Sequence, residues 1–302
     1  MEQVPTVIGQ LVAPWDQSLG QTGSNWQSNR HDGTSVHFAK YGAFLDLVVR
    51  LCGSGTLGTT ASSEVFIRSP QLGWASLGNV SPGVPRKHTN AVVLPCGSIV
   101  VIGGDNVNGA VLTTATYING VGWQPIPSAD SPSRRDYHAT AVLLEDGRVL
   151  VGGGEGRHPA GGGGSDYDIF KPWYLQGSPA PGRPSIVSIT GSAVSNADDT
   201  WLLSNDQTNL TLTATLPVTS SNDDAVPTDF LARLVLIAPG SITHHSDMSA
   251  RYVELDSMLV AGTTNKRVFN VPGNTVLPRG YYMLFAMSNA NIPSVAAWVK
   301  IQ

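Results

Sequence analysis

Two stretches of the sequence repeat one pattern 50 residues apart and decide the fold. The first is "HTNAVVLPCGSIVVIGGD", residues 88–105, and the second is "HATAVLLEDGRVLVGGGE", residues 138–155. Each starts with a histidine and continues with an apolar run, a turn that contains a glycine, a second apolar run and consecutive glycines. A glycine supplies the positive φ that a hairpin turn needs, and consecutive glycines let the chain leave a strand close to a neighbouring backbone. The pattern predicts two equivalent β-hairpins.

Further short strands flank these hairpins. "SSEVFIRSPQLGWASLG" before the first hairpin contains Trp74, and "TTATYINGVGWQPIP" after it contains Trp123. Four short strands in a unit of about 50 residues are the signature of a kelch-type β-propeller blade. We therefore expect kelch-like blades over residues 61–178. Residues 1–60 retain an apolar run and glycines in "YGAFLDLVVRLCGSGTLG" but lack the hairpin turn, which predicts a degenerate or damaged blade region.

The pattern changes after "QGSPAPGRPSI", residues 176–186, whose prolines and glycines predict a linker. Beyond it, about seven runs of β-branched and aromatic residues are separated by turn residues. Such spacing is typical of an Ig-like β-sandwich, here over residues 183–302. The expected fold is all-β: an incomplete kelch-type propeller of about three blades followed by an Ig-like sandwich.

The composition agrees with an all-β chain and excludes some functions. The 302 residues include 33 Gly and 20 Pro, and the formal net charge is −4, which offers no basic field for nucleic acid or an anionic membrane surface. No apolar run approaches the roughly 18 residues of a membrane span, and the first residues lack the features of a signal peptide. Two cysteines, Cys52 and Cys96, are too few to indicate a compartment or a redox state.

Tyr137 and His138 stand side by side at the start of the second hairpin. Successive side chains of a regular strand point to opposite faces, so a shared task requires an irregular strand entry. One interpretation is structural: Tyr137 packs between blades and His138 bonds a loop, as the equivalent position of His88 suggests. The other is a metal site with the histidines of "APGSITHHSDMSARYVEL", residues 238–255. A phenol and two imidazoles suit Cu(II), and a bound cation lowers the pKa of a phenol.

Four blocks of the sequence cover roughly residues 134–302 and read "RRDYHATAVLLEDGRVLVGGG", "DYDIFKPWYL", "APGSITHHSDMSARYVEL" and "LPRGYYMLFAMSNANIPSVAAWVKI". Together they resemble the last blade and C-terminal domain of galactose oxidase and glyoxal oxidase, the copper radical oxidases. The earlier hairpin adds only general support for kelch repeats. The resemblance implies copper as cofactor and a small alcohol, aldehyde or carbohydrate as substrate. It implies oxidation of a primary alcohol or aldehyde by O₂, with release of hydrogen peroxide.

The resemblance also assigns roles to single residues. Tyr137 matches the family's axial copper tyrosine, which takes the proton from the substrate and is therefore the catalytic residue. His138 matches an equatorial metal ligand, and His244 matches the second imidazole. Thr243, Met248 and Arg251 fit the family pattern around His244, whereas His245 is a bystander. In the family, a loop of the C-terminal domain brings this second histidine to the propeller axis.

The chain departs from the family in its first half. The family's radical cofactor is a tyrosine joined to a cysteine by a thioether, and it lies in early blades. The cysteines and tyrosines that precede the Tyr-His pair are Cys52, Cys96, Tyr41 and Tyr117, and none has the family's sequence setting. No cross-linked pair can be placed, so we expect impaired activity, because Cu(II) alone accepts one electron.

The length sets a similar limit, because a seven-bladed ring needs over 300 residues, at roughly 45 to 50 per blade, before the sandwich. We therefore expect a truncated or decayed member of the family whose exposed blade edges favour self-association. The family is mostly secreted, but the sequence itself leaves the localisation open.

Another class of function is a non-catalytic kelch plus Ig-like module that binds glycan or protein. A hydrolase is disfavoured because no G-x-S-x-G elbow occurs. The glycine-rich "GEGRHPAGGGGSD", residues 154–166, lacks the Lys-Ser/Thr of a phosphate-binding loop and predicts a flexible excursion. Its His158 is expected to be solvated or to line a substrate mouth.

Overall fold

A computed structural model describes thirteen ranges of the chain. They are residues 32–40, 45–55, 58–59, 61–67, 73–79, 85–104, 115–118, 122–125, 135–154, 167–177, 182–215, 231–244 and 246–302. Almost all regular structure in these ranges is β-strand, with a single 3₁₀ turn, so the all-β prediction is confirmed. No helix in the described ranges is long and apolar enough to cross a membrane.

The N-terminal half forms three antiparallel meanders in chain order. The first contains β1 (Thr34–Lys40), β2 (Leu45–Leu51), β5 (Ser62–Ile67) and β6 (Gly73–Asn79), with the small hairpin β3 (Ser54–Gly55) and β4 (Gly58–Thr59) between β2 and β5. The second contains β7 (Asn90–Val93), β8 (Ile99–Ile102), β9 (Ala115–Ile118) and β10 (Gly122–Pro125). The third contains β11 (Ala139–Leu143), β12 (Val149–Gly153) and β13 (Tyr167–Phe170).

Both predicted hairpins are present with the expected register. In β7–β8 Asn90 pairs with Ile102, and in β11–β12 Ala139 pairs with Gly153. Every residue of β7 and β8 is buried, whereas burial alternates along β11. The buried side chains of these strands join those of β1 and β2 in one hydrophobic cluster. Burial of apolar area at about 25 cal/mol per Å² therefore holds the three meanders together.

The C-terminal half is a sandwich of two sheets that follows the turn η1 (Trp173–Leu175). One sheet has the order β14 (Ser185–Thr190), β17 (Leu210–Thr215), β23 (Lys266–Phe269), β22 (Ser257–Leu259). The other contains β15 (Ser195–Ala197), β16 (Thr200–Leu203), β25 (Ala297–Ile301), β24 (Gly280–Ser288), β18 (Leu231–Ile237) and β21 (Tyr252–Glu254). A second hydrophobic cluster takes side chains from both sheets, which is the core of a β-sandwich.

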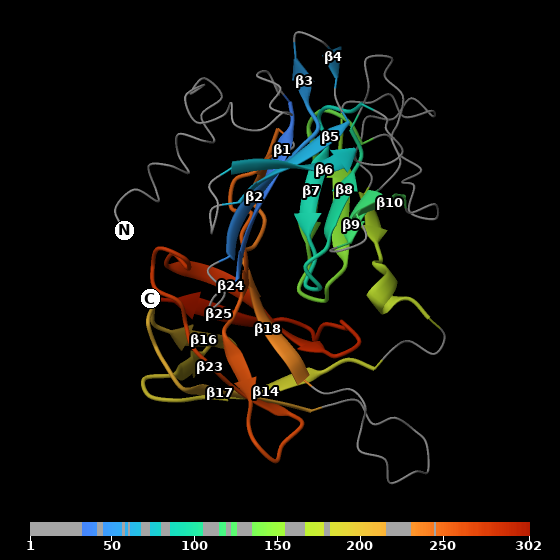
Figure 1. The fold of residues 1–302 in the computed structure, drawn as a ribbon. Coiled ribbons are helices and arrows are strands. Elements are labelled where there is room, and N and C mark those ends of the chain that lie inside the picture. The colour runs from blue at the N-terminus through green and yellow to red at the C-terminus, as the bar shows by residue number, and fades with distance from the viewer. Residues whose placement is uncertain are drawn as a thin grey trace.

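The two halves are joined by strand pairing. β1 lies parallel to β21, with Phe38 opposite Tyr252, so the first meander and the larger C-terminal sheet form one sheet of ten strands. Figure 1 shows β1, β2, β5, β7 and β8 above and β14, β16, β17, β23 and β25 below. The division at residue 60 stays a prediction, although β2 on one side of it pairs with β5 on the other.

A short hairpin of the C-terminal half meets all three meanders. It consists of β19 (Ile242–Thr243) and β20 (Ser246–Asp247), with Ile242 opposite Asp247. β19 contacts β11, and β20 contacts β1 and β7. These three strands are the first of their meanders, so the hairpin lies where the entries to the three sheets converge.

Candidate functional site

The residues that precede β1, β7 and β11 share an unusual backbone conformation. Asp32, His88 and His138 have φ values of 59°, 56° and 62°. Positive φ is uncommon outside glycine and is best tolerated by Asp, Asn and His. The three residues are therefore structural equivalents at the entries of the three meanders. Sequence reasoning missed Asp32, because no hairpin motif follows it.

In the second and third meanders, a buried arginine holds the segment that leads into the first strand. The Nη1 group of Arg86 donates to the carbonyl of Gly103 at 3.1 Å, and that of Arg135 donates to Gly153 at 2.9 Å. Arg135 also pairs with Asp168 on β13, at 2.7 Å between Nη2 and Oδ2. Both arginines are about 1% exposed. Each guanidinium thus ties the chain before a hairpin to the glycine at the end of the same hairpin.

One additional residue accounts for the Tyr-His pair. Arg86 and Arg135 are 49 residues apart, whereas the histidines that follow them are 50 apart. The additional residue is accommodated in a β-turn, in which the amide of Ala139 donates to the carbonyl of Asp136 at 3.0 Å. The positive φ of His138 at the third position of this turn is what a type II turn requires. Tyr137 and His138 occupy the two central positions, so they are not on opposite faces of a strand.

The turn and the β19–β20 hairpin bring three rings together. The ring centroids of Tyr137 and His138 are 3.9 Å apart and stacked, and those of His138 and His244 are 5.2 Å apart, nearly edge to face. Tyr137 and His244 are 5.9 Å apart. Both histidines are exposed and Tyr137 is half-buried, so the cluster is open to small molecules from solvent.

The β19–β20 hairpin holds His244 in a defined orientation. The carboxylate of Asp247 accepts hydrogen bonds from the amides of Ser241 at 2.9 Å and Ser249 at 3.0 Å, which stabilises the base of the hairpin. The hydroxyl of Thr243 lies 2.8 Å from Nδ1 of His244. A metal-bound imidazole commonly donates its other N–H to such an oxygen. Thr243 is therefore placed to orient His244 so that Nε2 remains available to a metal.

The other residues of the motif lie around this hairpin in different settings. Met248 is 73% exposed, and Arg251 donates through Nη1 to the carbonyl of Val276 at 2.8 Å. His245 and His158 lie outside the described residues. These positions leave Arg251 in a structural contact and Met248 at the surface.

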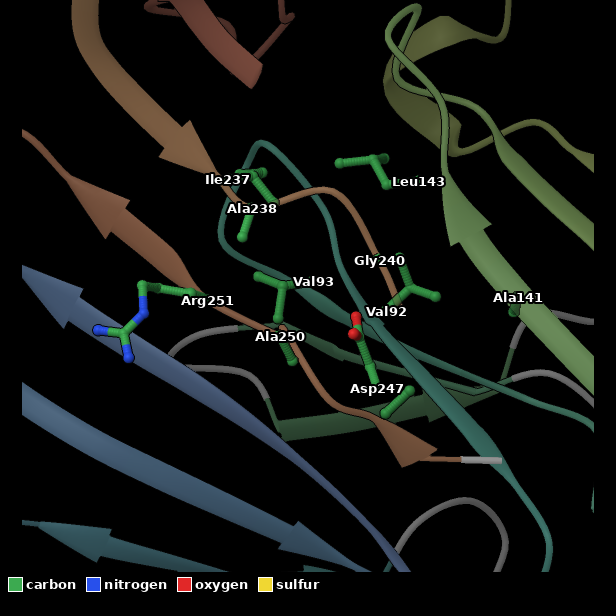
Figure 2. Close-up of a pocket in the computed structure, with 11 residues that line it drawn as sticks. Val92, Val93, Ala141, Leu143, Ile237, Ala238, Gly240, Asp247, Ala250 and Arg251 are labelled. Atoms are coloured by element: carbon green, nitrogen blue, oxygen red, sulfur yellow. The ribbon is translucent and has the colours of Figure 1, made fainter. Parts of the chain in front are cut away.

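A small cavity lies beside the hairpin, between it and the first strands of the second and third meanders. Figure 2 shows its lining, which comes from β7, β11 and the segment that leads into and out of the hairpin: Ala91, Val92, Val93, Ala141, Leu143, Ile237, Ala238, Gly240, Asp247, Ala250 and Arg251. The volume of ≈ 20 Å³ has room for about one water molecule. A ligand larger than water would therefore reach the ring cluster from its exposed side.

The donor set fits copper by its chemistry. Imidazole nitrogens and a phenol oxygen are ligands that Cu(II) accepts, and these three donors come from two loops that different strands hold in place. In the described ranges, no three side chains taken only from His, Cys, Asp and Glu lie close enough together to hold a metal ion. A metal ion held by His138 and His244 could take the phenol of Tyr137 as its third donor.

The two cysteines lie at different places in the meanders. Cys52 follows β2 and is buried, and Cys96 lies in the turn that closes β7–β8, at the opposite end of that hairpin from His88. Both are free thiols, and burial raises the pKa of the Cys96 thiol. Tyr41 and the side chain of Tyr117 lie outside the described residues.

Comparison with known proteins finds relatives in the family that the sequence motifs resemble. Residues 193–301 match the family described as Galactose oxidase-like, Early set domain. A galactose oxidase of Gibberella zeae is 29% identical over 230 residues, which cover 72% of this chain and 29% of that protein. The aldehyde oxidase GLOX of Vitis pseudoreticulata is 24% identical over 300 residues, which cover 89% of this chain and 53% of that protein. The chain is a homologue of the galactose and glyoxal oxidases.

A solved structure extends the likeness to the N-terminal half. A fungal alcohol oxidase of the AA5 family, solved in complex with copper, has a TM-score of 0.71 and 24% identity. The match covers 91% of this chain and 55% of that chain, and at this identity it shows a common fold. The chain spans about half the length, or less, of these three proteins.

Proposed function

We propose that this oxidase homologue binds one copper ion through Tyr137, His138 and His244, and that the site acts on a primary alcohol or an aldehyde. The observation that carries the proposal is the convergence of these three rings within 5.9 Å, from two loops about 106 residues apart. The homologues named galactose oxidase and aldehyde oxidase support the substrate class. We also propose that the meanders are kelch-type propeller blades, of which this chain contains about three.

Each side chain would have a separate role in such a site. His138 and His244 would hold the metal, and Thr243 would keep His244 in place through Nδ1. As a phenolate that the metal would favour, the oxygen of Tyr137 would accept the hydroxyl proton of the substrate and become a phenol, as the general base of the reaction. Copper would polarise that hydroxyl and accept one electron. The full reaction takes two electrons and two protons from the substrate and passes them to O₂ as hydrogen peroxide.

The proposed oxidase reaction also needs an acceptor for the second electron, because Cu(II) accepts only one. Neither Cys52 nor Cys96 has the family's sequence setting for a cross-linked tyrosine, and Cys96 is separated from the ring cluster by the length of the β7–β8 hairpin. We therefore propose impaired turnover with the metal site retained. The same observation favours a second candidate, a non-catalytic module that binds glycan or protein and keeps the ring cluster as inherited scaffold.

Copper titration followed by EPR spectroscopy separates these proposals. We expect one-to-one binding of Cu(II) with nitrogen hyperfine structure, lost in a His138→Ala, His244→Ala double variant. A His158→Ala, His245→Ala double variant is the matched control, because it removes two histidines that we do not predict to bind the metal. Weak binding that is equal in both variants would contradict the copper site and leave the binding module as the function.

Peroxide release tests the impairment separately. The copper-loaded chain is mixed with a primary alcohol or an aldehyde, and hydrogen peroxide is measured with a peroxidase-coupled dye. We expect release no faster than from a copper–peptide complex used as reference. Rapid release that requires Tyr137 would show a complete two-electron site and refute the proposed impairment.

A further inference from the structure

His88 lies against the candidate site, although the family motif assigns it no role. Its ring centroid is 4.8 Å from that of Tyr137, with 49° between the ring planes. Tyr137 thus contacts three imidazoles, those of His88, His138 and His244, at 4.8, 3.9 and 5.9 Å. His88 is the only one of the three that comes from the second meander.

His88 is held firmly by the first meander. Its amide donates to the carbonyl of Asp32 at 2.8 Å, and its Nε2 lies 3.6 Å from Oδ2 of the same aspartate. The side chain of His88 is 12% exposed, compared with 39% for that of Asp32. The two residues have the same left-handed backbone conformation. Contacts from Asp32 to His88 to Tyr137 therefore link the entries of all three meanders.

The contacts of His88 differ from those of the proposed metal donors. Its Nε2 lies beside the Asp32 carboxylate, and its ring lies against the phenol of Tyr137. Tyr137 occupies a central position of a β-turn and is not part of a strand ladder. The His88 ring, 4.8 Å away and 12% exposed, restricts the rotamers of the phenol, because tilted ring pairs at this distance attract one another.

We propose that His88, oriented by Asp32, is a positioning residue that fixes the phenol ring of Tyr137 beside His138 and His244. The consequence for copper affinity rests on the proposed function, whereas the effect on the ring does not. Loss of the His88 ring removes one of the contacts that hold the phenol, so the phenol samples more rotamers. A smaller fraction of molecules then presents the phenol oxygen together with the two imidazoles, and the apparent affinity falls by that fraction.

The first test uses the metal-free protein. NMR spectra of tyrosine-labelled full-length chain are recorded, and the Tyr137 signals are assigned by comparison with Tyr137→Phe. His88→Asn removes the ring, and asparagine tolerates the positive φ at this position. Asp32→Asn removes the charge that orients the ring. Asp199→Asn is the matched control, since Asp199 has a φ of 57° in the turn between β15 and β16.

We expect the Tyr137 ring signals to move toward the positions of an exposed tyrosine in His88→Asn, to move less in Asp32→Asn, and to stay unchanged in Asp199→Asn. His88→Phe, which restores an aromatic ring, should return the signals part of the way. Unchanged Tyr137 signals in a folded His88→Asn would overturn the proposal. If His88→Asn does not fold, Asp32→Asn decides, and unchanged signals there overturn it.

The second test adds Cu(II). We expect His88→Asn to weaken copper binding about fivefold and to reduce the phenolate-to-copper absorption, with the nitrogen hyperfine pattern retained. Loss of one nitrogen coupling would show that His88 is a ligand and overturn the positioning role. Failure of the wild-type chain to bind copper would refute the proposed function, and the metal-free spectra would still decide the role of His88.

Discussion

In the second meander, one residue separates the buried Arg86 from the left-handed His88, and in the third, two residues separate Arg135 from His138. Both arginines donate to a glycine carbonyl at the end of their own hairpin, Gly103 and Gly153, so the framework of the two meanders is the same. The additional residue forms a turn whose central positions hold Tyr137 and His138. A single inserted residue thus places a phenol next to an imidazole without altering the strands that carry them.

The closed ends of the two hairpins are also matched. Gly97 lies under the hydroxyl of Tyr252, and the hydroxyl of Tyr174 donates to the carbonyl of Gly147 at 2.6 Å. Tyr252 belongs to β21 and Tyr174 to the turn η1, so different segments cover equivalent positions. Because each hairpin is fixed at its closed end, its open end can differ in length. The comparison suggests that scaffold and site are separable in this fold.

The largest expected effect concerns the two arginines. Arg135→Met should lower the free energy of unfolding by about 3 kcal/mol, because it leaves the partly buried Asp168 without its closest cation. Arg86→Met should cost about 1.5 kcal/mol, since the bond it loses is to a backbone carbonyl. Urea unfolding followed by circular dichroism measures both. Equal losses would mean that the Asp168 pair adds nothing to the third meander.

Deletion of Tyr137 should convert the third entry into the form of the second. We expect a folded protein whose affinity for Cu(II) is at least tenfold lower, equivalent to about 1.4 kcal/mol. Isothermal titration calorimetry gives the affinity, and the far-ultraviolet circular dichroism spectrum checks the fold. Lys87→Ala, in the entry of the second meander, is the control and should leave binding unchanged. A deletion variant that does not fold would show that the additional residue is part of the scaffold.

Tyr174→Phe should cost about 1 kcal/mol by removing the hydrogen bond to Gly147. Burial raises the pKa of the Tyr174 phenol well above its usual value of 10, so only the neutral form suits the fold. Its contribution is complete below about pH 10 and declines as the pH rises above that value, where the unfolded phenol ionises. Thermal unfolding between pH 8 and pH 11 should therefore show a smaller decline for the variant. A parallel decline in both proteins would contradict this assignment.

The smallest expected effect is a difference in stability between alanine variants of two turn glycines. Gly97 and Gly147 have φ values of 85° and 82°, so alanine at either position should cost about 1 kcal/mol. An added Cβ would lie 3.3 Å from the Tyr252 hydroxyl at Gly97 but no closer than 3.5 Å to any atom at Gly147. Gly97→Ala should consequently be the more destabilising by a few tenths of a kcal/mol. Melting temperatures of the two variants, measured side by side, check the order.

The sequence by itself determined the features that depend on neighbouring residues. Alternating or continuous apolar runs and turn glycines predict the all-β class and both hairpins, because strand and turn preferences act over a few residues. Tyr137, His138 and His244 were also identifiable as candidates, from residue type and from the resemblance to a family. Their roles in copper binding remain predictions for the experiments above.

Only the tertiary structure decided how distant segments meet. Three contacts join residues that are 49 to more than 200 positions apart: the parallel pairing of β1 with β21, the approach of His244 to His138 and the contact of His88 with Tyr137. No local pattern encodes such contacts, because they follow from the packing of whole sheets around shared apolar cores. Asp32 illustrates the limit: its conformation matches that of His88 and His138, yet no hairpin motif marks it, and only its place before β1 reveals the equivalence.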